Sequence, residues 1–196
     1  MKRLHGGGSV ASRTQIVCLC EGGKGESIDE VFINKLMKSL KPAWIRNQGS
    51  NIIRLVPCGG RKRIIERMPR ELQSCLSAGG DTTLMVWADC DDDCADGEAL
   101  KAQFWQEAQQ RHTSRDDFDR VVFVFAKDRL ENWIQYLETG ATEEGNEGPR
   151  VKDNHAVAKA AAKLADLCKT GKPVGEMPPS LQWSCKNWHD LARRLR

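Results

Sequence analysis

The feature that most restricts the fold of this chain is a repeated alternation of two hydrophobic patterns. Nearly continuous apolar runs are each followed by a longer segment with apolar residues at helical spacing; the runs span residues 15–20, 51–58, 82–90 and 119–128. Continuous apolar strands are typical of a parallel sheet that is buried on both faces, and the intervening segments are long enough for crossover helices. The sequence therefore predicts an α/β fold with a mostly parallel four-stranded sheet and helices on both faces.

The two ends of the chain lie outside these four units. Residues 1–14 are expected to form a flexible lead-in to a core at 15–140. A loop rich in glycine and glutamate and then an alanine-rich segment predict a C-terminal helical extension at 141–196. Within the helix predicted at 61–77, Pro69 is expected to break or restart the helix, because proline lacks the backbone N–H that a helix interior uses.

Composition and cysteine usage exclude several classes of protein. The chain of 196 residues has a net charge of +3, which by itself is too small to indicate nucleic-acid binding. Its eight cysteines include no CxxC pair, and only four histidines are present, so neither a zinc site nor a disulfide framework is indicated. The N-terminus lacks the apolar segment of a signal peptide, and no run approaches the roughly 18 apolar residues of a membrane span. We expect a cytoplasmic protein with reduced thiols and no membrane contact.

Acidic residues follow three of the four predicted strands. The first run ends at Glu21, the third leads through Asp89 to Asp91, and Glu131 follows the fourth by about one helical turn. In an open parallel sheet, ligands bind outside the carboxyl ends of the strands, and alternate strand residues share a face. Carboxylates gathered there suit one hard cation or two neighbouring ones. Some of these acids would otherwise cap turns and helix N-termini, but the coincidence of several at one edge favours a metal site.

The glycine-rich segment at residues 20–30 has two possible functions, phosphate binding or the presentation of acids. It contains neither the GxxxxGK[ST] string of a P-loop nor the GxGxxG fingerprint of dinucleotide sites. It is better interpreted as a loop that presents Glu21, with Glu26 or Glu30 as a second acid, and the sequence does not separate these two. Asp29 is interpreted instead as part of the first helical turn, where a negative charge suits the helix dipole.

Three short motifs, in this order and each at the end of a predicted strand, resemble the Toprim domain. They are Cys20-Glu21-Gly22, Gly59-Gly60 and Asp89-Cys90-Asp91, within residues 15 to about 100. The rest of the chain resembles the OLD-like branch, in particular small stand-alone Toprim proteins found beside ABC-type ATPases in phage-defence operons. The resemblance implies a Toprim-like, Rossmann-like fold and a metal-dependent nuclease that hydrolyses phosphodiester bonds in DNA or RNA.

The resemblance also implies roles for individual residues. One or two Mg²⁺ or Mn²⁺ ions would be held by a set of acids, Glu21, Glu26, Glu30, Asp89, Asp91 and Glu131. In a second version of the mechanism Glu21 serves as general base. Lys152, in the extension that would complete the site, would stabilise the charge that builds on the phosphate, and Lys127 is a competitor for that role.

Basic residues near the strand ends are candidates for binding a nucleic-acid substrate. These are Arg61, Lys62, Arg63 and Lys127. An ordinary solvated helix face explains the first three equally well. As partner, the resemblance implies an ABC-type ATPase in an anti-phage defence system. The alternative function is a non-catalytic binding or regulatory subunit of the same fold that docks to such an ATPase, and a third is phosphoryl transfer or hydrolysis on a small substrate.

Overall fold

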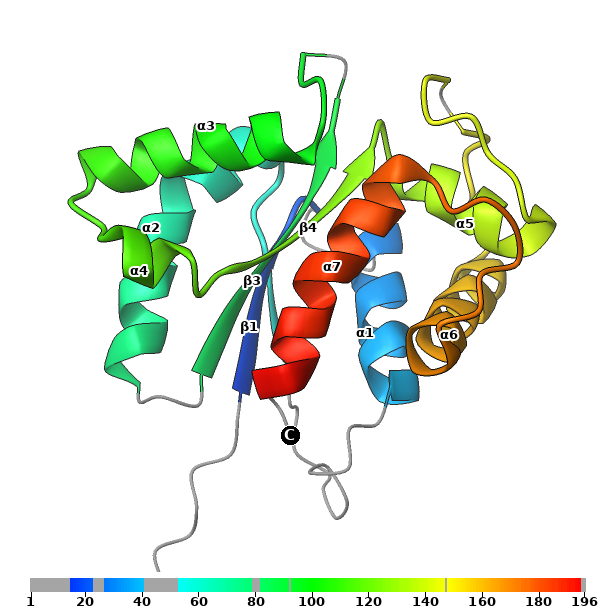
Figure 1. Cartoon of the computed structure of the whole chain (residues 1–196), viewed down its shortest axis with the longest axis horizontal. Coiled ribbons are helices and arrows are strands. Elements are labelled where there is room, and N and C mark those ends of the chain that lie inside the picture. The colour runs from blue at the N-terminus through cyan, green and yellow to red at the C-terminus, as the bar shows by residue number, and fades with distance from the viewer. Residues whose placement is uncertain are drawn as a thin grey trace, which may run out of the picture.

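A computed structural model describes residues 15–22, 27–40, 53–78, 82–91, 93–146 and 148–194. The expected lead-in at 1–14 lies outside these ranges. The four strands in the described ranges form one sheet, and they are β1 (Gln15–Cys20), β2 (Ile53–Pro57), β3 (Thr82–Cys90) and β4 (Val122–Lys127). All three pairs are parallel and the strand order is β2-β1-β3-β4 (Figure 1). The predicted four-stranded parallel sheet is therefore confirmed.

Helices cover both faces of the sheet, as predicted. Those in the described part of the chain are α1 (Ile28–Leu40), α2 (Arg61–Ser77), α3 (Gly97–Gln110), α4 (Arg115–Phe118), α5 (Leu130–Thr139), α6 (Asn154–Thr170) and α7 (Pro179–Arg194). Helices α2, α3 and α4 lie on one face, and α1, α5 and α6 lie on the other (Figure 1). Helix α7 runs along β4.

Each face of the sheet has its own hydrophobic core, because successive strand residues point to opposite sides. On the α1 side, Trp87 of β3 packs between Phe32 and Trp133, with ring centroids 5.8 and 5.7 Å away. On the α3 side, Phe104 stacks on Phe125 of β4 with centroids 5.7 Å apart. The strand ends are therefore held on both sides by large buried side chains, which gives the loops that follow them a rigid support.

The C-terminal helix α7 satisfies the backbone groups along the open side of β4. The Ser184 hydroxyl accepts a hydrogen bond from the Phe125 N–H (3.0 Å) and donates one to the Phe125 carbonyl (3.1 Å). The Asn187 side-chain amide donates to the Phe123 carbonyl (3.1 Å). An uncovered edge strand would expose a row of unpaired N–H and C=O groups. The predicted extension therefore packs on the same sheet as the core and closes one of its edges.

The interpretation of Pro69 as a helix breaker is wrong. Helix α2 is continuous from Arg61 to Ser77, with Pro69 inside it. A proline in this position removes one backbone hydrogen bond. Met68, Pro69 and Leu72 are all buried on the face of α2 that meets the sheet, so core packing on both sides of the proline keeps the two halves of the helix in line.

The cysteines and the helix lengths agree with the expectations from composition. All eight cysteines are free thiols, and six of them are buried. Among the residues that the structure describes, no helix is both long and apolar enough to cross a membrane.

Candidate functional site

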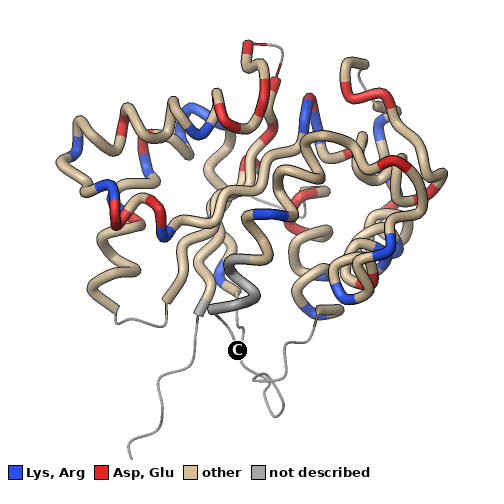
Figure 2. Tube along the Cα trace, in the orientation of Figure 1, with Lys and Arg blue, Asp and Glu red and all other residues tan. Residues whose placement is uncertain are grey.

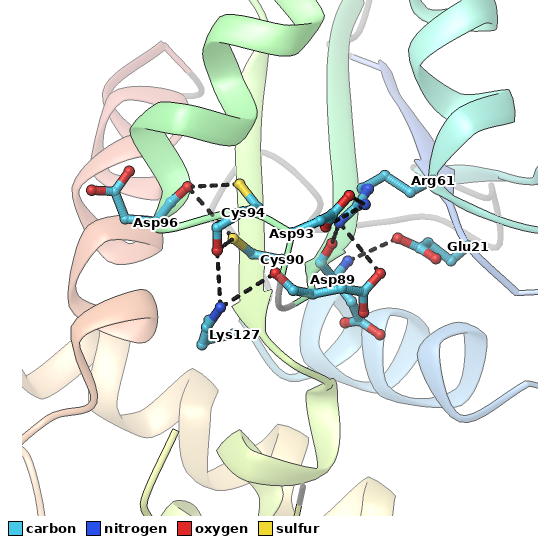
Figure 3. A network of polar contacts seen from close by, with 9 residues as sticks. Glu21, Arg61, Asp89, Cys90, Asp93, Cys94, Asp96 and Lys127 are labelled. Carbon is cyan, nitrogen blue, oxygen red and sulfur yellow. Dashed lines mark hydrogen bonds and ion pairs between the residues drawn. The ribbon is translucent and has the colours of Figure 1, made fainter. Parts of the chain in front are cut away.

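The exits of β1, β2 and β3 lie at one end of the sheet, where acidic positions gather (Figure 2). The Gly59 N–H donates a hydrogen bond to the Gly22 carbonyl (3.2 Å), which joins the loops after β2 and β1. The Asp89 N–H donates to the Glu21 carboxylate (2.9 Å), which joins the exits of β3 and β1 (Figure 3). Parallel topology thus brings Glu21 and Asp89 into direct contact although 68 positions separate them in the sequence.

A close approach at Gly22 sets the position of α1 against the end of β1. A Cβ atom at Gly22 would lie only 2.2 Å from the Ser27 hydroxyl oxygen, so no larger residue fits without a shift. That hydroxyl in turn accepts a hydrogen bond from the Glu30 N–H (3.2 Å) at the start of α1, which is typical of a helix N-cap. The first turn of α1, with Asp29 and Glu30, is therefore held next to the strand exits.

Three half-buried acids, Glu21, Asp29 and Asp89, form a group that we call the inner carboxylates. Burial raises the pKa of Asp89 well above its usual range, and the charges of Asp29 and Glu21 raise it further. Burial also raises the pKa of Asp29 to about 6, with further increases from Glu21 and Glu131. The pKa of Glu21 is likewise raised, mainly by burial, although the Asp89 N–H partly offsets the increase. The charges of Glu21 and Asp29 therefore oppose the ionisation of Asp89, and the charge of Glu21 opposes that of Asp29.

Two further predicted ligands face this group, and one cannot be placed. Glu131, in the first turn of α5, contributes to the raised pKa values of both Asp29 and Asp89. Glu30 contributes to the raised pKa of Asp29. Glu26 lies outside the described residues. The choice between Glu26 and Glu30 as the second loop acid therefore stays open, while Glu131 reaches the inner carboxylates from the opposite helix.

Asp91 and Asp93, in the loop after β3, form a second group that we call the outer acids. Both side chains are exposed, and Arg61 at the start of α2 pairs with both (Figure 3). Arg61 Nη1 lies 3.3 Å from Asp91 Oδ2, and Nη2 lies 2.7 and 2.5 Å from the two oxygens of Asp93. Hydrogen bonding to Arg61 also lowers the pKa of Asp93. The sequence predicts that Arg61 contacts the substrate. In the structure its guanidinium instead forms ion pairs with Asp91 and Asp93.

The other predicted cations have different surroundings. The Lys127 ammonium donates to the carbonyls of Asp91 (3.3 Å) and Cys94 (2.9 Å), so it holds the loop after β3 from the side opposite Arg61 (Figure 3). Lys62 and Arg63 are exposed on the first turn of α2. No side-chain hydrogen bond or ion pair links either of them to another described residue. They are available to a ligand, whereas Lys127 is committed to the loop.

Lys152, the predicted catalytic lysine, is exposed in the connection between α5 and α6. Its ammonium forms no hydrogen bond or ion pair with the residues that the structure describes. The same connection is tied to the strand ends by the buried Asn132, whose side-chain amide donates to the carbonyls of Lys127 (3.1 Å) and Asn146 (3.3 Å). This link holds the connection that carries Lys152 next to the end of β4.

Asp29 is the site residue that sequence reasoning missed. Its interpretation as a first-turn acid is correct as far as it goes, since Asp29 does lie in the first turn of α1. However, Phe32 and Ile33, three and four positions later, are fully buried, and residues at these spacings share one face of a helix. Asp29 therefore lies on the buried face of α1. The spacing of Asp29 to these two residues is a signal in the sequence, but the apolar residues of this segment do not by themselves fix which face of α1 is buried.

We compared the chain with protein-family models, curated proteins and solved structures, and none of them matches it.

Whether these residues fit a metal ion depends on donor chemistry and on arrangement. The oxygen donors are those that Mg²⁺ and Mn²⁺ prefer, and the inner carboxylates form no ion pair with a described cationic side chain. In the arrangement seen, however, no three His, Cys, Asp or Glu side chains of the described ranges are placed to hold one ion together. Glu21 is engaged by the Asp89 N–H and Asp91 by Arg61. The donor set fits a divalent ion, and its closure around one requires these side chains to turn.

Proposed function

We propose that this protein is a metal-dependent nuclease of the Toprim type that hydrolyses phosphodiester bonds in DNA or RNA. One observation carries the proposal: Glu21 and Asp89 meet half-buried at adjacent strand ends, Asp29 lies in electrostatic range of both, and the pKa of each of the three acids is raised, mainly by burial. Charges that are taken out of water without a partner are costly, and strongly perturbed acids gathered at one point are characteristic of functional sites. A divalent cation is the counter-charge that such a group would take.

Glu21, Asp89 and Asp91 would hold the ion, with Glu30 or Glu131 available to a second one. A bound Mg²⁺ or Mn²⁺ would neutralise charge on the scissile phosphate and lower the pKa of an attacking water. Asp29 extends the predicted set, because it lies in electrostatic range of both Glu21 and Glu131. The strand ends supply rigid positions for Glu21 and Asp89, which a site for phosphoryl chemistry requires.

The protein's own groups have separable tasks in this proposal. Glu21 is fixed by the Asp89 N–H, and the raised pKa of its carboxyl makes it the better proton acceptor if it serves as general base. Lys62 and Arg63 would contact the phosphates of the substrate and position it without reading its sequence. Lys152 would approach the phosphate from the connection after α5 and stabilise the charge that develops there.

The Toprim identity and the partner rest on the resemblance of the motifs. In support of the first, Glu21-Gly22 and Gly59-Gly60 follow β1 and β2, and Asp89 lies at the end of β3; these are three neighbouring strands of one parallel sheet. The partner we propose is an ABC-type ATPase that activates the nuclease in anti-phage defence. The alternative function, a regulatory subunit without catalysis, is separated from the nuclease by the experiment below.

The test is metal-dependent cleavage and its loss in a matched pair of variants. Wild-type protein is incubated with DNA and with structured RNA in Mg²⁺, Mn²⁺ or EDTA, alone and with its co-purifying ATPase. Asp89→Asn should reduce cleavage at least about 100-fold, the size typical of losing one charge-stabilising group. Asp166→Asn, on the exposed side of α6, is the control and should cleave normally. Cleavage that survives Asp89→Asn or EDTA contradicts the proposal, and inactive wild type that still binds the ATPase favours the regulatory alternative.

A further inference from the structure

Arg61 bridges two loops that are 28 or more positions apart in the sequence. It begins α2 directly after Gly59 and Gly60, whose φ angles of 74° and 132° favour glycine and turn the chain sharply into the helix. From there its guanidinium reaches the loop after β3, where it donates to the Asp89 carbonyl (3.4 Å) and pairs with Asp91 and Asp93 (Figure 3). Arg61 is the cation of the described residues that pairs with the Asp91 carboxylate.

The exposures of the partners show which group is fixed and which is free to move. The Arg61 side chain is 14% exposed, whereas those of Asp91 and Asp93 are 59% and 63% exposed. A rigid guanidinium is therefore held beside two carboxylates that still face water. Its bond to Asp91 is the longer one, at 3.3 Å, against 2.5 Å for the nearest oxygen of Asp93. Asp93 is the stronger anchor, so Asp91 is the partner that is more readily given up.

We propose that Arg61 is a counter-ion built into the site, which occupies Asp91 in the ion-free protein and yields it when a divalent cation binds. The proposal rests on the proposed function, since it takes Asp91 to be a ligand of that cation. Asp93 would keep the released guanidinium next to the ion. Arg61 then has a free fork of N–H donors, which matches a phosphate oxygen pair in geometry and charge. The same side chain would thus pair first with Asp91 and then with the substrate.

The expected size of the competition follows from Coulomb's law. A guanidinium and a divalent ion roughly 6–7 Å apart in a water-exposed site repel each other enough to change affinity by about five- to tenfold. Replacing Arg61 by a neutral side chain should therefore tighten metal binding by about that factor. A purely structural role for Arg61 predicts the opposite, because a loop that has lost its anchor would hold its carboxylates less well.

The test is Mn²⁺ affinity, measured by calorimetric titration of the full chain without any substrate. Arg61→Gln should bind Mn²⁺ about five- to tenfold more tightly than wild type. Arg70→Gln is the matched control: it removes the same charge from the same helix, at an exposed position whose side chain contacts no other described residue, and should leave the affinity unchanged. Equal or weaker binding by Arg61→Gln overturns the proposal.

Asp89→Asn separates failure of this inference from failure of the proposed function. If wild type binds Mn²⁺ and Asp89→Asn does not, the proposed metal site is supported. The Mn²⁺ affinity of Arg61→Gln relative to wild type then decides whether Arg61 is the counter-ion. If wild type and Asp89→Asn bind alike, the proposed function and this inference both fall.

A measurement on wild-type protein covers the case in which Arg61→Gln does not fold. The ¹⁵N-labelled Nε–Hε resonance of Arg61, assigned through its own backbone, is followed during titration with diamagnetic Mg²⁺. If Arg61 leaves Asp91 on ion binding, the resonance shifts in proportion to site occupancy. A resonance that does not move while the Asp89 amide does would overturn the proposal.

Discussion

The acids around the exit of β3 fall into two groups with opposite surroundings. The inner carboxylates, Glu21, Asp29 and Asp89, are half-buried, and burial raises the pKa of each. The outer acids, Asp91 and Asp93, are exposed and are paired with Arg61. Arg61 forms its ion pairs with the acids that water already solvates. Its charge also partly offsets the rise in the pKa of Glu21, but none of the described cationic side chains forms an ion pair with an inner carboxylate.

This difference indicates which group is adapted to a ligand. Ion pairs with solvated carboxylates contribute little to stability, with a median of about 0–1 kcal/mol, so the exposed side chains of Asp91 and Asp93 do not depend on Arg61 to offset a loss of hydration. Unpaired acids that are partly removed from water destabilise the fold, so their retention calls for a compensating ligand. We infer that the inner carboxylates are shaped for a cation and that Asp91, the outer acid with the longer bond to Arg61, joins them in holding it. Each prediction below tests this contrast.

The largest expected effect separates Asp29 from Asp93. Asp29→Asn removes a negative charge from the inner group and should lower both Mn²⁺ affinity and cleavage, the latter by about 100-fold or more. Asp93→Asn makes the same chemical change among the outer acids and should alter cleavage by no more than about threefold. The cleavage activities of the two variants are compared as initial rates at saturating metal. Equal losses in the two variants would show that burial does not distinguish the groups.

Asp29 also shows where sequence reasoning ends. The strands and the exits with Glu21 and Asp89 follow from the apolar runs and the rule for parallel sheets, and they lie where these predict. The face of α1 does not follow so directly. Ile28 and Val31 fit the helical spacing of apolar residues in this segment, yet the structure half-exposes both and buries Ile33 and Met37.

The reason is a rotation of the helix that its own periodicity does not fix. The close approach of Gly22 and Ser27 places the first turn of α1 beside the end of β1, and the periodicity of α1 alone does not predict this contact between segments. The pairing of Arg61 with Asp93 is a second feature that the sequence pattern does not predict. The two residues are 32 positions apart and meet only through the geometry of their loops. Patterns along the chain predict elements and their ends, whereas pairings between loops require the structure.

The second expected effect is on the pH dependence of stability without metal. Burial raises the folded-state pKa of Asp29 from 3.8 to about 6. The contribution of Asp29 to the unfolding free energy is therefore largest below pH 3.8, where its carboxyl is protonated in both states, and is lost as the pH rises toward about 7. The difference amounts to up to about 3 kcal/mol of unfolding free energy. Urea unfolding in EDTA between pH 4 and pH 7.5 should show this decline in wild type and a smaller one in Asp29→Asn.

The pKa of Asp93 is shifted in the opposite direction from that of Asp29, so an Asp93 variant is the control for the urea-unfolding measurement. Arg61 lowers the pKa of Asp93, so its contribution is present above pH 3.8 and is lost only as the pH falls further. Asp93→Asn should therefore show the wild-type decline between pH 4 and pH 7.5. A decline of the same steepness in Asp29→Asn and Asp93→Asn would contradict the assignment of the raised pKa to the inner carboxylates.

The third expected effect is stabilisation by the metal itself. At a Mg²⁺ concentration ten times the dissociation constant, binding to the folded state alone adds about 1.4 kcal/mol to the unfolding free energy. At pH 7, wild type and Asp93→Asn should both gain this amount, and Asp89→Asn should gain almost none. NaCl at matched ionic strength controls for screening of the acids. A gain in Asp89→Asn as large as in wild type would mean that the ion binds elsewhere.

The smallest expected effect concerns the second cation of the outer loop. Lys127 donates to the carbonyls of Asp91 and Cys94, and both hydrogen bonds are lost in Lys127→Gln. Because the ammonium is only partly shielded from water, we expect a decrease of about 1 kcal/mol in unfolding free energy with the Mn²⁺ affinity little changed. Lys152→Gln, at an exposed lysine without contacts to the described residues, is the stability control and should unfold like wild type. A large loss of metal affinity in Lys127→Gln would show that the backbone of the outer loop also shapes the inner site, and the boundary between the two groups of acids would then need to be redrawn.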